Sequence, residues 1–328
     1  MIRRAGAWAL VGVAILAVVL AALRAEQQLA AINFRAFDDW RTYAFAVDRW
    51  LSGEPIYAPV QVAGPYELRD TLLTGFTYPP AAVPLFLPFS LGEPGLVAWL
   101  AANLGGFLVG LCAVLRREVG SVSSVAVGLT LLALAAFPPF SNAVVSGNLN
   151  LGIAGLLAWA WASDAHGRLA VSAGVGSIMK IFPGLVAAWP ARAAGIRAIS
   201  WATAVAVALA LASVPLVGLD AWRDFAAALA NARPECSPQS ISIGCGLADL
   251  VGPSAAQLTG IAVALVLVLA VLLVRSRYPA YVALGGAMLA PVVDMHPHYW
   301  LFAWTVAYVG VVRIVGRRVR RRTAGLPA

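Results

Sequence analysis

Carboxylates are the side chains of this sequence best suited to acid–base chemistry, and more than half of them lie in the polar stretch 24–93. Two of them are adjacent, Asp38 and Asp39, at the start of the run D-D-W-R-T-Y. A carboxylate is ionised near neutral pH, so it can take the proton of an attacking hydroxyl group as a general base. Because this stretch follows the first long apolar segment, we expect Asp39 at the membrane surface, within reach of a substrate anchored in lipid.

Cationic and hydrogen-bonding groups occur at four further places, which the topology puts on the same side of the membrane. Lys180 interrupts the run G-S-I-M-K-I-F-P-G, and a charge within an apolar stretch is costly and usually functional. Fixed cations and donors could stabilise the negative charge that develops on a departing phosphate. The other three places are the polar runs 146–150, 236–240 and 294–298.

A short helix is predicted immediately after the acidic pair. Trp40, Tyr43, Val47 and Trp50 recur at helical spacing, which predicts a helix over residues 40–51 that ends at the following Ser-Gly. An aspartate is a preferred N-cap. The sequence therefore leaves a structural role open for Asp38 or Asp39, namely capping this helix.

The other polar groups also have ordinary explanations that the sequence leaves open. Asn148 could cap a helix, since asparagine is common at that position. Lys180 could extend its long side chain to the water interface. His296 and His298 lie in a predicted turn, where such residues often have no role in chemistry.

Composition identifies the elements that must position these groups as membrane helices. The 328 residues are 61% hydrophobic and 12% charged, whereas soluble domains have roughly 25% charged residues. Apolar runs of about 18 residues or more predict spanning helices. Six such runs are clear, and four shorter ones accompany them: 5–23, 95–115, 122–140, 199–219, 258–274 and 299–315, then 149–162, 169–179, 181–191 and 280–293.

The predicted fold is an all-α polytopic membrane protein, with about ten transmembrane or half-membrane helices and a single domain over residues 1–328. Two long loops, 24–93 and 220–257, would lie on the outer side. With the N-terminus in the cytoplasm, 15 of the 23 basic residues and two of the 15 acidic residues fall on the cytoplasmic side, as the positive-inside rule requires. This topology needs a hairpin around Lys180. It places both termini in the cytoplasm and the polar groups on the outer face of a plasma membrane.

The net charge of +8 does not indicate nucleic-acid binding. The basic C-terminal run R-R-V-R-R-R is better explained as an anchor on anionic membrane lipid. No sequence motif of a metal site, a phosphate-binding loop or a serine nucleophile is present, so no metal or other cofactor is predicted. Cys236 and Cys245 share an outer loop, where an oxidising compartment would let them form a disulfide; two free thiols are the alternative.

Several of these runs, in this order, are similar to a known family. They are D-W-R-T-Y with L-S-G-E-P-I-Y, then F-T-Y-P-P, S-G-N-L-N, M-K-I-F-P-G and A-P-V-V-D-M-H-P-H-Y. The chain resembles glycosyltransferase family 87, polytopic enzymes of the GT-C fold that include actinobacterial α-1,2-mannosyltransferases. One difference is that Asp294 stands where the family usually has a tryptophan, two places before the late histidine.

The resemblance implies an inverting, metal-independent transfer on the outer face. The sugar, mannose in the first instance, would pass from a polyprenyl-phosphate donor to a glycolipid or cell-envelope glycan. Asp39 matches the family's catalytic aspartate and would be the general base. The donor phosphate would be bound by Lys180, His296 and His298. The sugar or the acceptor would be bound by Asp38, Tyr43, Tyr78, Asn148, Asn150 and Gln239.

Three alternatives stay open at the level of sequence. An arabinofuranosyltransferase that uses polyprenyl-phosphate arabinose would share the same chemistry. A lipid or solute transporter or flippase would also have short, broken helices and an intramembrane cation, although no internal repeat is evident. A non-catalytic subunit of an envelope-assembly complex is the third.

Overall fold

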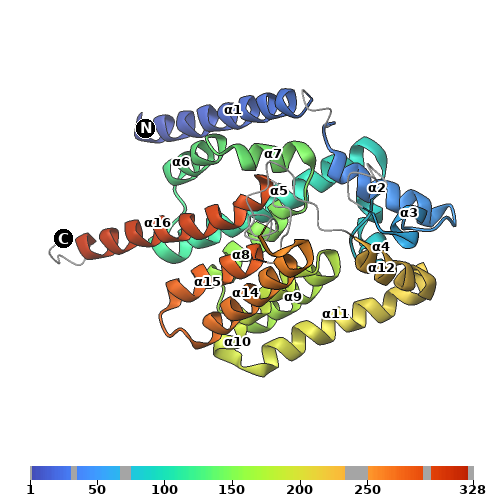
Figure 1. Ribbon diagram of the computed structural model, residues 1–328. Coiled ribbons are helices and arrows are strands. Elements are labelled where there is room, and N and C mark those ends of the chain that lie inside the picture. Colours follow the sequence, from blue (N-terminus) through green and yellow to red (C-terminus); the bar gives the residue numbers. More distant parts are fainter. Residues whose placement is uncertain (1, 31–34, 67–74, 233–249, 291–296, 324–328) are drawn as a thin grey trace. The chain divides into compact units, whose positions relative to one another are not determined.

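The computed structural model describes residues 2–30, 35–66, 75–232, 250–290 and 297–323 (Figure 1). Within these ranges the regular elements are all helices, apart from one isolated bridge between Tyr66 and Ala232. The prediction of an all-α protein is therefore confirmed.

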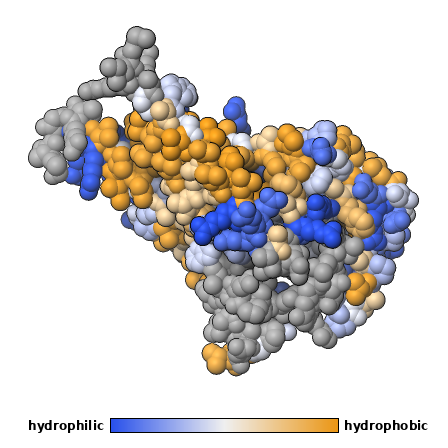
Figure 2. Space-filling model, turned by 90° about the horizontal axis from the view of Figure 1, so that it is seen from above, coloured by the Kyte–Doolittle hydropathy of each residue, from blue (hydrophilic) through white to orange (hydrophobic). Residues whose placement is uncertain are grey.

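Five helices are long and apolar enough to cross a membrane: α1 (Ile2–Ala30), α5 (Gly92–Val119), α11 (Ile196–Val217), α14 (Pro253–Leu273) and α16 (Trp300–Thr323). They coincide with five of the six predicted spans. Large apolar side chains on these helices are exposed; Val109, Leu211 and Val266, for example, are each about two-thirds exposed. Figure 2 shows broad apolar areas of the surface. Lipid must cover these side chains, so the chain is a multi-pass membrane protein.

The sixth predicted span, 122–140, is not a single helix as expected. It is divided into α6 (Ser124–Ala135) and α7 (Pro138–Ser146), which meet at 81°. The cause is the pair of prolines that opens α7, because a residue that precedes proline is driven out of the helical region. Phe137 is accordingly extended, with φ −111° and ψ 94°. The count of candidate spans is five, or six if this bent pair crosses as one.

The shorter apolar runs form shorter helices. These are α8 (Asn150–Ala162), α9 (His166–Met179), η3 (Phe182–Ala187), α10 (Ala188–Ala194) and α15 (Arg277–Leu289). The chain reverses at Lys180, as predicted: α9 ends at Met179, and the 3-10 helix η3 packs back against it. This hairpin leaves the lysine at its turn.

The two long polar stretches carry short helices. The first contains α2 (Asp38–Leu51), α3 (Pro59–Ala63), α4 (Ala82–Phe86) and η2 (Leu87–Phe89); the second contains α12 (Leu219–Asn231). The predicted helix 40–51 is confirmed as α2 and begins two residues earlier. A last 3-10 turn, η4 (Pro297–Tyr299), precedes α16.

Contacts divide the chain into two units, which are described separately. The first consists of Met1–Phe37, Leu100–Ser163 and Pro297–Ala328, and the second of Asp38–Trp99 and Asp164–His296. In the first, α1 packs on α6 and α7, and α16 packs on α8. In the second, α9 packs on α11, and α14 packs on α15. That the chain acts as a single domain remains a prediction.

Close helix packing in both units depends on glycine. In the first unit a Cβ on Gly155 of α8 would lie 2.6 Å from the backbone oxygen of Gly106 on α5. In the second unit a Cβ on Gly174 of α9 would lie 2.5 Å from the oxygen of Ala202 on α11. Small residues let membrane helices approach this closely.

Candidate active site

The N-terminal turn of α2 carries both candidate aspartates. Asp38 and Asp39 lie inside the first helical turn, not at the cap position that the sequence suggested. Negative charge is favourable there because it faces the positive end of the helix dipole. Asp38 forms an ion pair with Arg41, one helical turn later. The distance from Arg41 Nη1 to Asp38 Oδ1 is 3.4 Å. Phe37, just before α2, has φ +64°, a conformation that bulky residues rarely adopt outside constrained sites.

Tyr43 extends the face of α2 on which Asp39 lies. Residues four apart are neighbours on a helix surface, so the carboxylate of Asp39 and the ring of Tyr43 belong to the same face. Tyr43 is buried. Its ring stacks on Phe86 with centroids 4.6 Å apart and meets Trp99 edge-on at 5.3 Å. This aromatic packing fixes which way the face of α2 with Asp39 and Tyr43 is turned, namely toward Phe86 and Trp99.

Tyr78 links α2 to the lysine of the α9–η3 hairpin. The hydroxyl groups of Tyr43 and Tyr78 are hydrogen-bonded at 3.1 Å. The ammonium group of Lys180 lies 5.7 Å from the centre of the Tyr78 ring and 5.3 Å from that of Phe182, within the range of cation–π attraction. Three residues that are far apart in the sequence are therefore in one chain of contacts, and Asp39 lies one helical turn from its first member.

Two side chains that the sequence did not single out hold the Tyr78 segment in place. Tyr57 Oη donates to the backbone oxygen of Tyr78 at 2.6 Å. Gln61, fully buried, donates through Nε2 to the backbone oxygen of Phe76 at 3.2 Å and accepts through Oε1 from the Ala58 N–H at 3.0 Å. The irregular run Phe76–Pro80 thus takes its position from hydrogen bonds rather than from a helix of its own.

Tyr57 is suited to a permanent donor role. Burial, together with the nearby charge of Asp224, raises the pKa of Tyr57 well above its usual value of 10. The hydroxyl group consequently keeps its proton at any physiological pH and keeps its bond to Tyr78.

The remaining described candidates lie in the first unit. Gly147 ends α7 in the left-handed conformation, and Asn148 then accepts the Asn150 N–H through Oδ1 at 2.8 Å at the start of α8. Asn148 does therefore serve as a helix-terminal acceptor, one of the roles that the sequence left open. Asn148, Asn150 and His298 are all buried, and η4, which carries His298, packs on α7.

The structure thus places the predicted residues in two groups. Asp38, Asp39, Tyr43, Tyr78 and Lys180 belong to the second unit, where contacts connect the last three, whereas Asn148, Asn150 and His298 belong to the first. Four predicted residues lie outside the described ranges: Cys236, Gln239, Cys245 and His296. The proposed disulfide is among them.

The sequence gives only weak signals for the roles of Tyr57 and Gln61. Tyr57 closes the run L-S-G-E-P-I-Y, which was noted as a motif, but its hydrogen bond to a carbonyl 21 residues away leaves no trace in local spacing. Gln61 is the single polar residue of P-V-Q-V-A, and a lone amide on a short helix usually faces solvent.

Comparison with known protein families gives a match. The family model described as glycosyltransferase family 87 matches residues 76–294, more than half of the chain. Searches of curated proteins and of solved structures find no similar protein. The matched segment contains Tyr78, Asn148, Asn150 and Lys180 but begins after α2.

Proposed function

Because the chain belongs to glycosyltransferase family 87 and is a membrane glycosyltransferase, we propose that it transfers mannose from a polyprenyl-phosphate donor. The acceptor is a hydroxyl group of a glycolipid or cell-envelope glycan. The proposal extends to a GT-C-like fold, with both termini in the cytoplasm and the two long loops on the outer face of the plasma membrane. The distribution of arginine and lysine supports this orientation.

Asp39 is the general base in this proposal. The acceptor oxygen attacks the anomeric carbon while Asp39 takes its proton, and the bond between that carbon and the phosphate oxygen breaks with inversion. The polyprenyl phosphate leaves as a monoester that carries one more negative charge. Because α2 lies before the family match, the assignment of Asp39 as the base is supported by its position in the first turn of α2, one helical turn before Tyr43.

Lys180 stabilises the leaving phosphate. A fixed cation aimed at developing charge is among the most effective catalytic devices, and the hairpin turn that holds Lys180 also keeps it over the ring of Tyr78. The hydroxyl groups of Tyr43 and Tyr78 and the carboxylate of Asp38 would bind sugar hydroxyls beside it. Asn148, Asn150 and His298, with Gln239 and His296, are assigned to the sugar or the phosphate as the resemblance implies.

One observation carries the proposal, the chain of contacts from Tyr43 through Tyr78 to Lys180. It connects the helix that holds a carboxylate with a cation, in a protein whose family transfers sugars. A general base and an electrostatic partner for a phosphate are the two components that this reaction needs.

The test is transfer by the purified protein in liposomes. Polyprenyl-phosphate mannose with a radiolabel on the sugar is supplied together with a membrane glycolipid extract, and polyprenyl-phosphate arabinose is run in parallel. Labelled glycolipid from the mannose donor supports the proposal. Label transferred only from arabinose would reassign the donor. Movement of intact donor across the bilayer, without a new glycosidic bond, would support the transporter instead.

A further inference from the structure

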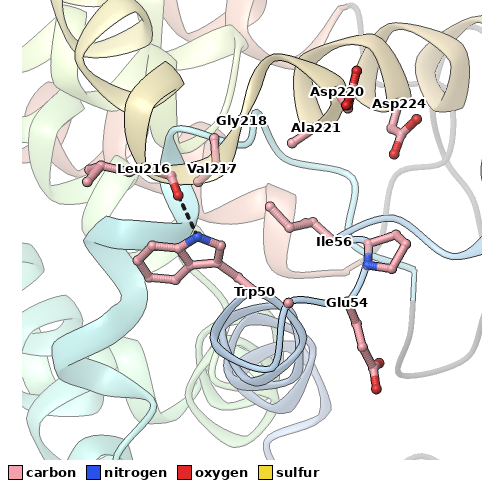
Figure 3. A pocket seen from close by; sticks show the side chains of 11 residues that line it. Trp50, Glu54, Ile56, Leu216, Val217, Gly218, Asp220, Ala221 and Asp224 are labelled. Atoms are coloured by element: carbon pink, nitrogen blue, oxygen red, sulfur yellow. Dashed lines mark hydrogen bonds between the residues drawn. The ribbon is translucent and has the colours of Figure 1, made fainter.

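A cavity of about 440 Å³ lies in the second unit, where α2 ends beside the junction of α11 and α12 (Figure 3). This volume is within the range of about 300–1,000 Å³ typical of small-molecule sites. Nothing in the proposed mechanism uses it. Figure 3 shows Trp50 and Ile56 on one side, with Asp220 and Asp224 across from them on α12.

One wall of the cavity is a rigid aromatic and apolar surface. Trp50 Nε1 donates to the backbone oxygen of Leu216 at 2.9 Å, which fixes the plane of the indole. Ile56 and Val217 also line the cavity with apolar side chains. The sharp junction at Gly218, where φ is +83°, brings α12 back over it.

Apart from the indole of Trp50, the polar side chains that line the cavity are acceptors. Glu54, Asp220 and Asp224 line the cavity, and none of the lining residues is basic. Glu54 is paired with Arg49 at 3.9 Å, but the residues that line the cavity carry only negative charge, which disfavours an anionic ligand such as the phosphate of the donor. Within the described part of the chain, no three acidic, histidine or cysteine side chains converge closely enough to hold a metal ion. Asp220 is moreover paired with Arg223 at 2.8 Å.

A neutral sugar ring matches both walls. Its axial C–H groups form an apolar face that packs on an indole, and its hydroxyl groups are donors for carboxylates, which accept through two oxygens each. Hydrogen bonds to charged acceptors are stronger than neutral ones. The two places therefore select different substrates by charge. The anionic donor is attracted to Lys180, whereas a neutral glycan fits in the cavity beside Trp50.

The cavity and the candidate base are at opposite ends of one helix. Asp39 and Trp50 are eleven residues apart on α2, which corresponds to about 16 Å along its axis. The cavity also adjoins the Tyr78 segment, because Ile56 lines it and the next residue, Tyr57, donates a hydrogen bond to the backbone oxygen of Tyr78. A molecule that occupied the cavity and the site together would have to be a chain of several sugars.

We propose that this cavity binds a sugar residue of the acceptor remote from the hydroxyl group that is glycosylated, so that the acceptor is an extended oligosaccharide. The proposal rests on the proposed function for the identity of the acceptor. It predicts that the cavity contributes to the affinity for long acceptors and not to the chemical step.

The test compares acceptors of increasing length, from a single α-mannosyl residue to an α-mannotetraose on the same lipid, with the double variant Glu54→Gln/Asp224→Asn. KM for the tetrasaccharide should rise by about tenfold, since two hydrogen bonds to charged acceptors are weakened, while kcat is kept. KM for the single-sugar acceptor should not change. Asp48→Asn, an exposed carboxylate of α2 that does not line the cavity, is the matched control.

Binding of soluble α-mannotetraose, measured by calorimetry without any donor, separates this proposal from the proposed function. Weaker binding by the double variant, with no change in Asp48→Asn, supports the cavity even if no transfer is detected. Glu54→Gln alone should weaken binding as well. If the wild type and the double variant are both active and prefer long acceptors equally, the proposed role of the cavity is refuted. The proposed glycosyltransferase function is then unaffected.

Discussion

Tyr57→Phe tests whether the Tyr78 segment owes its position to one hydroxyl group. The substitution removes the 2.6 Å hydrogen bond to the oxygen of Tyr78 and leaves the buried packing of the ring against Phe76 and Phe225 in place. A partly buried carbonyl that loses its donor costs about 1–2 kcal/mol of folding free energy. Because Tyr78 contacts both Tyr43 and Lys180, a shift of this segment should lower kcat by about ten- to a hundredfold.

Tyr66→Phe is the matched control. Tyr66 is as deeply buried as Tyr57, but its hydroxyl group receives only a long bond of 3.4 Å from Gln61, worth about 0.5 kcal/mol or less. Transfer kinetics and unfolding in mixed micelles would be measured for both variants. If the two variants lost kcat equally, or if Tyr57→Phe lost stability alone, the positioning role of Tyr57 would be refuted.

Two further predictions concern the cation and the helix packing. Lys180→Gln should lower kcat by about 10²–10³-fold, and Lys180→Arg should restore part of it by keeping the charge; equal activity in both would contradict a role in charge stabilisation. Gly155→Ala should destabilise the first unit by about 1–3 kcal/mol, because the new Cβ would meet the oxygen of Gly106 at 2.6 Å. Gly105→Ala, whose Cβ would meet nothing within 4 Å, is its control in thermal unfolding, and equal midpoints would show that the close approach is not needed.

The membrane helices were predictable because hydropathy is a local property. Each of the five candidate spans is a long apolar run, and α2 could be predicted from aromatic residues at helical spacing. The break before α7 was missed because a hydropathy window averages over Pro138 and Pro139, although the preference of a residue before proline would have predicted it.

The contacts of the site were only partly predictable. Lys180 and Tyr78 stood out by their types, a cation in an apolar run and a tyrosine before two prolines. That they face each other depends on how the α9–η3 hairpin packs, which no local pattern records. The cavity beside Trp50 was missed for the same reason: its carboxylates come from the segment after α2 and from α12, more than 160 residues apart, and each alone has the appearance of an ordinary exposed residue.

The most direct measurement of the central claim is the rate of mannose transfer by Asp39→Asn beside Asp38→Asn, which makes the same change one residue away. If Asp39 is the general base, Asp39→Asn should lower kcat by about 10²–10⁴-fold, with unfolding and donor binding unchanged. Asp38→Asn breaks a partly exposed pair with Arg41 and weakens a proposed contact to a sugar hydroxyl group, so it should act mainly on KM and lower kcat far less. Full turnover by a folded Asp39→Asn variant, or a larger loss in Asp38→Asn, would contradict the account.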